Sequence, residues 1–128
     1  MSYTISIDCP GASASVPAIF TANGGITSTT RPPPPGLSAQ CRLTYTDANG
    51  NAQSLCRNCA VVQPGDQPGS WCCRFDMTAA LPAAGGSLTI TVTLLDAGGS
   101  TIASDSKTLT YNANAANPCG NCAGDSPC

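Results

Sequence analysis

The chain lacks several residue types on which common enzyme chemistries depend. Its 128 residues contain no histidine, and all seven acidic residues are aspartate. General acid–base catalysis would therefore fall to aspartates or cysteines, and no serine or cysteine lies in a recognisable nucleophile motif. We expect a protein that is not an enzyme and that carries no cofactor.

Charge is scarce as well, at 9% of the residues. Nucleic-acid binding needs clustered basic side chains that neutralise neighbouring phosphates, and the five basic residues are scattered singly: Arg31, Arg42, Arg57, Arg74 and Lys107. No stretch approaches the roughly 20 apolar residues of a membrane-spanning helix. The sequence predicts neither a nucleic-acid partner nor a membrane span.

Cysteine, in contrast, is abundant. The nine cysteines are Cys9, Cys41, Cys56, Cys59, Cys72, Cys73, Cys119, Cys122 and Cys128, and all are candidates for disulfides. Because most cytosols keep thiols reduced, this density predicts an extracellular or cell-surface location. The odd number leaves one thiol to bond another molecule, bind a metal or stay free.

The first residues give no sign of an export signal. Met1 to Asp8 has neither the basic nor the apolar segment of a leader peptide. We expect that the leader is absent from this chain, or that the protein is exported or oxidised by another route.

Alternation with a period of two predicts strands. In 87–95, Leu88, Ile90, Val92 and Leu94 share one face and threonines the other; 96–100 then turns and 101–111 returns. A second hairpin joins 40–46, which carries Cys41, Leu43 and Tyr45 on one face, to 52–56 through a turn at 47–51. Further candidate strands are 3–7, 16–21 and 71–75.

About seven short strands separated by turns predict an all-β fold, a two-sheet antiparallel sandwich over residues 1–111. Its expected core contains Leu43, Tyr45, Trp71, Phe75, Leu88, Ile90, Val92 and Leu94. The prolines of 31–36 predict an extended surface connection. Residues 112–128 form an irregular tail, ordered only if its cysteines tie it down.

Two stretches resemble bacterial immunoglobulin-like repeats. Residues 70–110 are similar to the second half of such repeats. They contain, in order, the pattern Trp71-x-x-x-Phe75, a Leu81-Pro82 corner, an alternating strand, an Asp-x-x-Gly turn and a last strand. Residues 5–24 are similar to the first half, with Cys9 where a serine is common. The resemblance implies an immunoglobulin-like or fibronectin III-like sandwich, in a family whose members are mostly non-catalytic modules of adhesins, enzymes and surface fibres.

The cysteine positions leave several pairings open. The pairs Cys56/Cys59 and Cys119/Cys122 would supply an all-cysteine zinc site, although their wide separation favours disulfides with other partners. Adjacent Cys72 and Cys73 should point to opposite faces of a strand and so have separate partners. We expect Cys73, on the face of Trp71, to reach Cys41, and Cys72 to bond a loop or tail cysteine.

Residues 47–51 match the first ligand positions of a calcium loop. Ala52 stands where such a loop requires glycine and Asn58 where it requires glutamate, so a hairpin turn is preferred.

Three functions are consistent with the sequence. The preferred one is a disulfide-stabilised structural module that self-associates or decorates an extracellular fibre, appendage or shell. Its edge strands, such as 3–7, offer a route to pairing with a neighbour. The alternatives are a carbohydrate- or protein-binding adhesin-type module, which would use loops 27–36 and 62–70, and a zinc-stabilised module.

Overall fold

The computed structural model describes residues 3–28, 36–62, 69–122 and 124–128, and these form strands and connections without a helix. The nine strands in these ranges are β1 (Tyr3–Ile5), β2 (Ser15–Val16), β3 (Ile19–Ser28), β4 (Ser38–Thr46), β5 (Ala52–Val62), β6 (Gly69–Asp76), β7 (Ser87–Leu95), β8 (Thr101–Tyr111) and β9 (Ser126–Pro127). The all-β prediction is confirmed, with more strands than the seven expected. Nothing in the described part is a helix long and apolar enough to cross a membrane.

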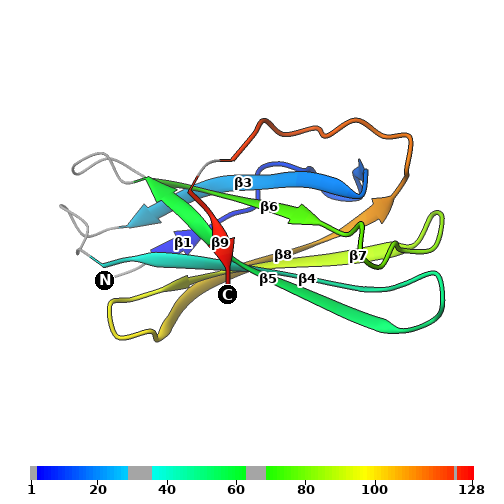
Figure 1. The fold of residues 1–128 in the computed structure, drawn as a ribbon. Helices are drawn as coiled ribbons and strands as arrows, with labels where there is room; N and C mark the ends of the chain where they lie inside the picture. Colours follow the sequence, from blue (N-terminus) through cyan, green and yellow to red (C-terminus); the bar gives the residue numbers. More distant parts are fainter. Residues whose placement is uncertain (1–2, 29–35, 63–68, 123) are drawn as a thin grey trace.

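The strands form one continuous, curled sheet. Their order is β1-β3-β6-β5-β4-β7-β8-β2, with β9 paired to β5 outside this path. All pairings are antiparallel except that of β2 with β8. The curl brings β3 and β6 over β4, β7 and β8, and β5 runs diagonally from one half to the other (Figure 1).

The core lies between the two halves. All eight residues expected there are buried: Leu43, Tyr45, Trp71, Phe75, Leu88, Ile90, Val92 and Leu94. The rings of Phe20 and Phe75 lie 5.5 Å apart between centroids, so β3 and β6 contribute a shared aromatic contact. The alternation of apolar and polar residues in the sequence therefore corresponds to an alternation of buried and more exposed side chains. In β7, for example, all four of the expected core residues are fully buried.

Two predicted strands extend far beyond their expected bounds. The strand expected over 16–21 is split into β2 and β3, and β3 continues to Ser28. The strand expected over 52–56 continues to Val62 because its second part leaves β4 and pairs with β6. This extension places Cys59 inside a strand.

The chain after β1 runs very close alongside β3, where the N–H groups of Ser6 and Asp8 donate to the carbonyls of Gly25 and Asn23. The indole Nε1 of Trp71 donates a hydrogen bond of 2.8 Å to the carbonyl oxygen of Ser6, which satisfies the buried ring nitrogen. Gly24 lies at this close approach, and a Cβ placed on it would come within 1.7 Å of the same oxygen. Only glycine allows this approach of the two backbones.

Two charged side chains of β8 join its edge to the segment that follows β1. Asp105 and Lys107 lie on the same side of β8 as buried Leu109. The Oδ2 atom of Asp105 accepts a hydrogen bond of 2.9 Å from the backbone N–H of Ile7, and the ammonium group of Lys107 donates to the carbonyl of Ile7. Charged residues that point inward from an edge strand hinder pairing with another chain.

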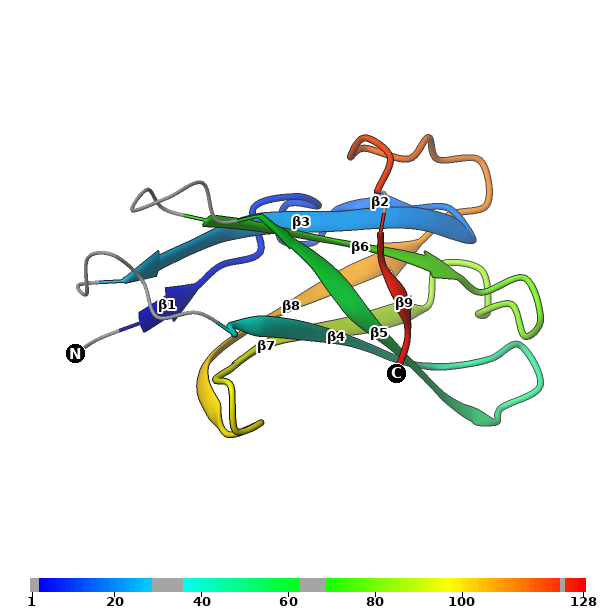
Figure 2. The same ribbon diagram turned by 60° about the vertical axis from the view of Figure 1, so that its left-hand side comes forward.

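The path of β5 leaves an opening in the sheet. Only Ala60–Val62 of β5 pair with β6, whereas residues from Ala52 to Cys59 pair with β4. Between the earlier part of β5 and residues 73–76 of β6, the two strands therefore diverge. We call this opening the seam; β9 pairs with β5 beside it (Figure 2).

Candidate functional site: the C-terminal tail and the seam

Four disulfides define the most distinctive feature of the molecule. They are Cys9–Cys119, Cys56–Cys128, Cys59–Cys73 and Cys72–Cys122. Their Cα–Cα distances of 4.8 to 5.9 Å lie within the usual span for such bonds. Three of the four join the tail to other parts of the chain: Cys9 after β1, Cys56 in β5 and Cys72 in β6. The tail is therefore ordered through its cysteines.

The expected bond between Cys41 and Cys73 is wrong. Cys73 does face the core beside Trp71, as predicted, but it bonds Cys59 of β5. The physical reason is the strand order: β5 is the neighbour of β6, and its extension to Val62 brings Cys59 next to Cys73. The expectation for Cys72 is confirmed, because it bonds Cys122 of the tail and not its sequence neighbour.

An ion pair joins the tail to the seam. One carboxylate oxygen of Asp125, Oδ2, accepts hydrogen bonds of 3.0 and 2.9 Å from Nε and Nη2 of Arg57. The same oxygen accepts a third bond, of 3.0 Å, from the backbone N–H of Arg74 in β6. The Asp125 side chain is only 8% exposed. Hydrogen bonds to charged groups in such surroundings are among the stronger ones in proteins.

The tail also covers backbone groups that the strands leave unpaired. The side-chain oxygen of Asn117 accepts a bond of 3.1 Å from the N–H of Thr21 in β3. At the other end, Arg57 and Asn58 of β5 pair with Pro127 and Ser126, and the N–H of Cys128 donates to the carbonyl of Cys56. Unpaired strand edges invite association with other chains, so the tail acts as an edge cover at two places.

The ninth cysteine is buried. Cys41 is free and fully inaccessible in β4, and burial raises the pKa of its thiol. Both properties oppose reaction, because the thiolate is the reactive form. Of the three fates open to the odd thiol, the structure shows it free inside the core.

We predict that Cys41 does not react in the native protein. A disulfide exchange reagent added to folded, oxidised protein at neutral pH should modify no thiol, whereas one thiol per chain should react after denaturation. The release of the reagent's chromophore measures both. A native chain that reacts rapidly, or a covalent dimer linked through Cys41, would contradict this prediction.

The alternative zinc site does not form. Cys56, Cys59, Cys119 and Cys122 each bond a different cysteine, so no set of four thiolates remains to hold the metal. Within the described ranges, no group of three or more cysteine and aspartate side chains is placed to hold a metal ion.

The 47–51 segment is a hairpin turn. Oδ1 of Asp47 accepts bonds of 2.9 Å from the N–H groups of Asn49 and Asn51, and Oδ2 accepts one from the side chain of Gln53. The hydrogen bond from Asn51, followed by that from Gln53, lowers the pKa of Asp47. The carboxylate therefore organises its own turn, which is the arrangement preferred over a calcium loop.

The outward side of β4, β7 and β8 is rich in hydroxyl groups. We call it the hydroxyl face; its members are Thr44, Thr46, Ser87, Thr89, Thr91, Thr93, Ser104, Ser106, Thr108 and Thr110, and Ser54 of β5 continues it. Thr44, Thr89 and Thr108 are paired in register across the three strands. Among the outward residues of these three strands, Arg42 alone is charged.

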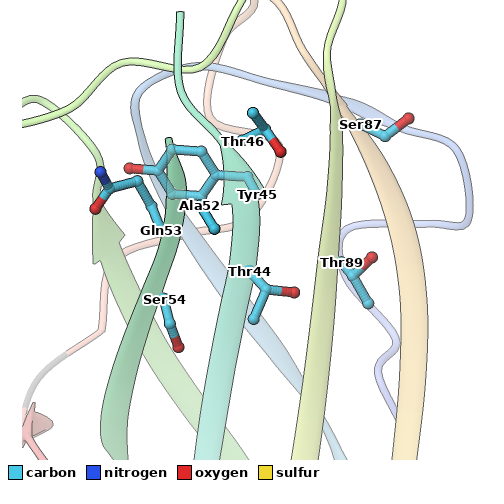
Figure 3. A pocket seen from close by; sticks show the side chains of 8 residues that line it. All are labelled: Thr44, Tyr45, Thr46, Ala52, Gln53, Ser54, Ser87 and Thr89. Carbon is cyan, nitrogen blue, oxygen red and sulfur yellow. The ribbon is translucent and has the colours of Figure 1, made fainter. Parts of the chain in front are cut away.

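A shallow depression of about 490 Å³ lies at one end of the hydroxyl face (Figure 3). Its side chains come from neighbouring strands β4, β5 and β7, with Thr44 between Ser54 and Thr89. All six aromatic side chains of the protein are buried or packed against the core, so no ring offers a flat platform to a sugar. Loops 27–36 and 62–70, expected to serve a binding module, fall largely on 29–35 and 63–68, outside the described residues.

Comparison with models of known protein families gives no match, and comparison with curated protein sequences gives none either. The functional interpretation therefore depends on the geometry of the tail, the seam and the hydroxyl face.

Two residues central to the seam were not singled out from the sequence. Arg57 lies inside the Cys56/Cys59 pair, and Asp125 is the only charged residue of the tail. The one acid in an otherwise uncharged segment was a signal that could have pointed to an ion pair. Its partner is recognisable only when β5 and the tail are seen together.

Proposed function

We propose that this protein is a non-catalytic, disulfide-stabilised structural module that acts as a subunit or decoration of an extracellular fibre, appendage or shell. The observation that carries the proposal is the tail: three disulfides fasten it over strand edges. Such cross-linking stabilises the module and limits unwanted strand pairing. An extracellular setting is proposed because the four disulfides need a non-reducing environment.

We further propose that the curled sheet is an immunoglobulin-like two-sheet sandwich formed by residues 1–111, to which the tail of 112–128 is attached. The contacts of Asp105 and Lys107 with Ile7 support this, because they join opposite edges of the curled sheet by side chains and not by strand pairing. A sandwich whose open side is closed in this way keeps its halves packed face to face.

The hydroxyl face supports self-association. Protein surfaces usually carry interspersed charges that keep copies apart, and weak net charge favours association. This face has one charge over three strands, and the net charge of the whole chain is −2. Two copies can therefore approach through it with Arg42 as the single charged side chain that each contributes.

Analytical ultracentrifugation of the oxidised protein tests this function. We expect the weight-average sedimentation coefficient to rise with protein concentration. Thr89→Lys, on β7, the middle of the three strands of the hydroxyl face, should remove the rise because the contact would have to desolvate a charge. Ser70→Lys makes the same change of charge at an exposed hydroxyl of β6, in the other half of the curled sheet, and should leave association intact. A monomer at every concentration would refute the proposed self-association.

A further inference from the structure

We propose that the seam of one chain accepts the C-terminal tail of a second chain, so that copies become joined by tail exchange. The exchanged part is Cys119, Cys122 and residues 124–128, which we call the clasp. This inference rests on the proposed self-association and adds to it a second contact between copies, at the seam, which becomes covalent.

The receiving surface belongs entirely to the body of the protein. It consists of the Arg57 guanidinium, the N–H of Arg74, the edge of β5 at Asn58, and the sulfur atoms of Cys9, Cys56 and Cys72. Every copy presents the same groups in the same arrangement. A clasp from another chain therefore meets the same carboxylate acceptor site, strand edge and cysteines as the chain's own clasp.

Apolar burial contributes little to keeping the clasp on its own chain. Of the described clasp residues, Cys119 alone is buried, and Gly124, Ser126, Pro127 and Cys128 are exposed. The contacts are the three disulfides, the Asp125 ion pair and the short pairing with β5. These contacts are identical within a chain and between chains, so the connecting segment decides which one forms.

The connecting segment allows the clasp to bind either its own chain or a second chain. Residues 112–118, between the end of β8 and Cys119, contain no strand and are mostly exposed (Figure 1). The eight steps from Tyr111 to Cys119 can extend over about 25 to 30 Å. A short connection of this kind gives the clasp an effective concentration of roughly millimolar order at its own seam. Binding of a clasp from another chain should therefore compete with binding of the chain's own clasp when the protein concentration is high, as in an assembly.

The chemistry is ordinary disulfide formation. With oxidised glutathione as the oxidant, each bridge forms when two cysteine thiols lose two protons and two electrons. Glutathione disulfide takes these up and becomes two molecules of reduced glutathione. The stoichiometry is the same whether the two cysteines lie in one chain or in two.

The test uses the wild-type sequence, which avoids variants that fail to fold. Equal amounts of unlabelled and ¹⁵N-labelled chains are reduced, denatured and refolded together in a glutathione buffer at several protein concentrations. Oligomers are then isolated under non-reducing conditions, digested and analysed by mass spectrometry. Because Lys107 is the last basic residue, trypsin separates the tail cysteines from those of the body.

We expect tail peptides of one isotope linked to body peptides of the other, through Cys9–Cys119, Cys56–Cys128 and Cys72–Cys122. Their share should increase with concentration. The Cys59–Cys73 bond is the internal control, because both cysteines lie in the single tryptic peptide 58–74 and should bond within it. Two copies of this peptide, of different isotope, joined through Cys59 and Cys73 would mean random cross-linking and would overturn the proposal.

The two proposals can fail separately. If oxidised protein forms oligomers whose tail bridges all join peptides of one isotope, tail exchange is wrong while self-association stands. If no oligomer forms at any concentration, the proposed self-association fails and tail exchange fails with it.

Discussion

Reduction of the four disulfides is expected to unfold the protein at room temperature. On the loop-closure scale, a bond that closes a loop of about 15 residues contributes about 3 kcal/mol, and one that closes about 100 residues contributes nearly 5 kcal/mol. The bonds here have sequence separations of 14, 50, 72 and 110 residues. Their summed contribution rivals the net stability of a typical domain, about 5 to 15 kcal/mol.

Circular dichroism measures this effect directly, by thermal melts with and without a phosphine reductant. The pair Cys9→Ser/Cys119→Ser should lower the free energy of unfolding more than Cys59→Ser/Cys73→Ser, because its bond closes the longer loop. A fully reduced protein that melts within a few degrees of the oxidised one would show that the core, not the cross-links, supplies the stability.

Gly24→Ala is expected to destabilise the protein by about 3 kcal/mol, near the upper end of overpacking effects. The added methyl group would lie 1.7 Å from the Ser6 carbonyl oxygen and 2.8 Å from the Trp71 ring nitrogen. Because the first obstacle is backbone, the segment that contains Ser6 must itself move, and the hydrogen bond from Trp71 to Ser6 would be strained or lost. The melting temperature should fall by about 10 °C.

Gly25→Ala is the matched control. It changes the neighbouring residue of the same strand, where the nearest atoms to an added Cβ lie 3.7 Å away, an ordinary van der Waals contact. Its effect should stay within about 0.5 kcal/mol. Equal melting temperatures for the two variants would refute the account of a close backbone approach at Gly24.

The strands themselves could be predicted well. The alternation in 87–95 and 101–111 matches the bounds of β7 and β8, and the turns at 47–51 and 96–100 join the hairpins as expected. Such features depend on residues close in sequence: a period of two in hydrophobicity, and aspartate and glycine in turns. The expected core could be predicted for the same reason.

The partners of the cysteines could not be predicted in this way. Cys72 and Cys73 show the difference: their opposite directions follow from neighbouring positions on a strand, and this part was right. The disulfide partner of each cysteine depends on which strand lies alongside β6. The partner expected from the sequence, Cys41, lies in β4, but the neighbour of β6 is β5, and Cys73 bonds Cys59.

Composition and local pattern were thus sufficient for an all-β protein that is rich in cysteine and has few charges. The pairing of the cysteines, the burial of Cys41 and the meeting of Arg57 with Asp125 were decided by how distant segments pack. The reason is physical: side-chain direction along a strand is set by local backbone geometry, whereas strand order and the path of the tail follow from the packing of the whole sheet.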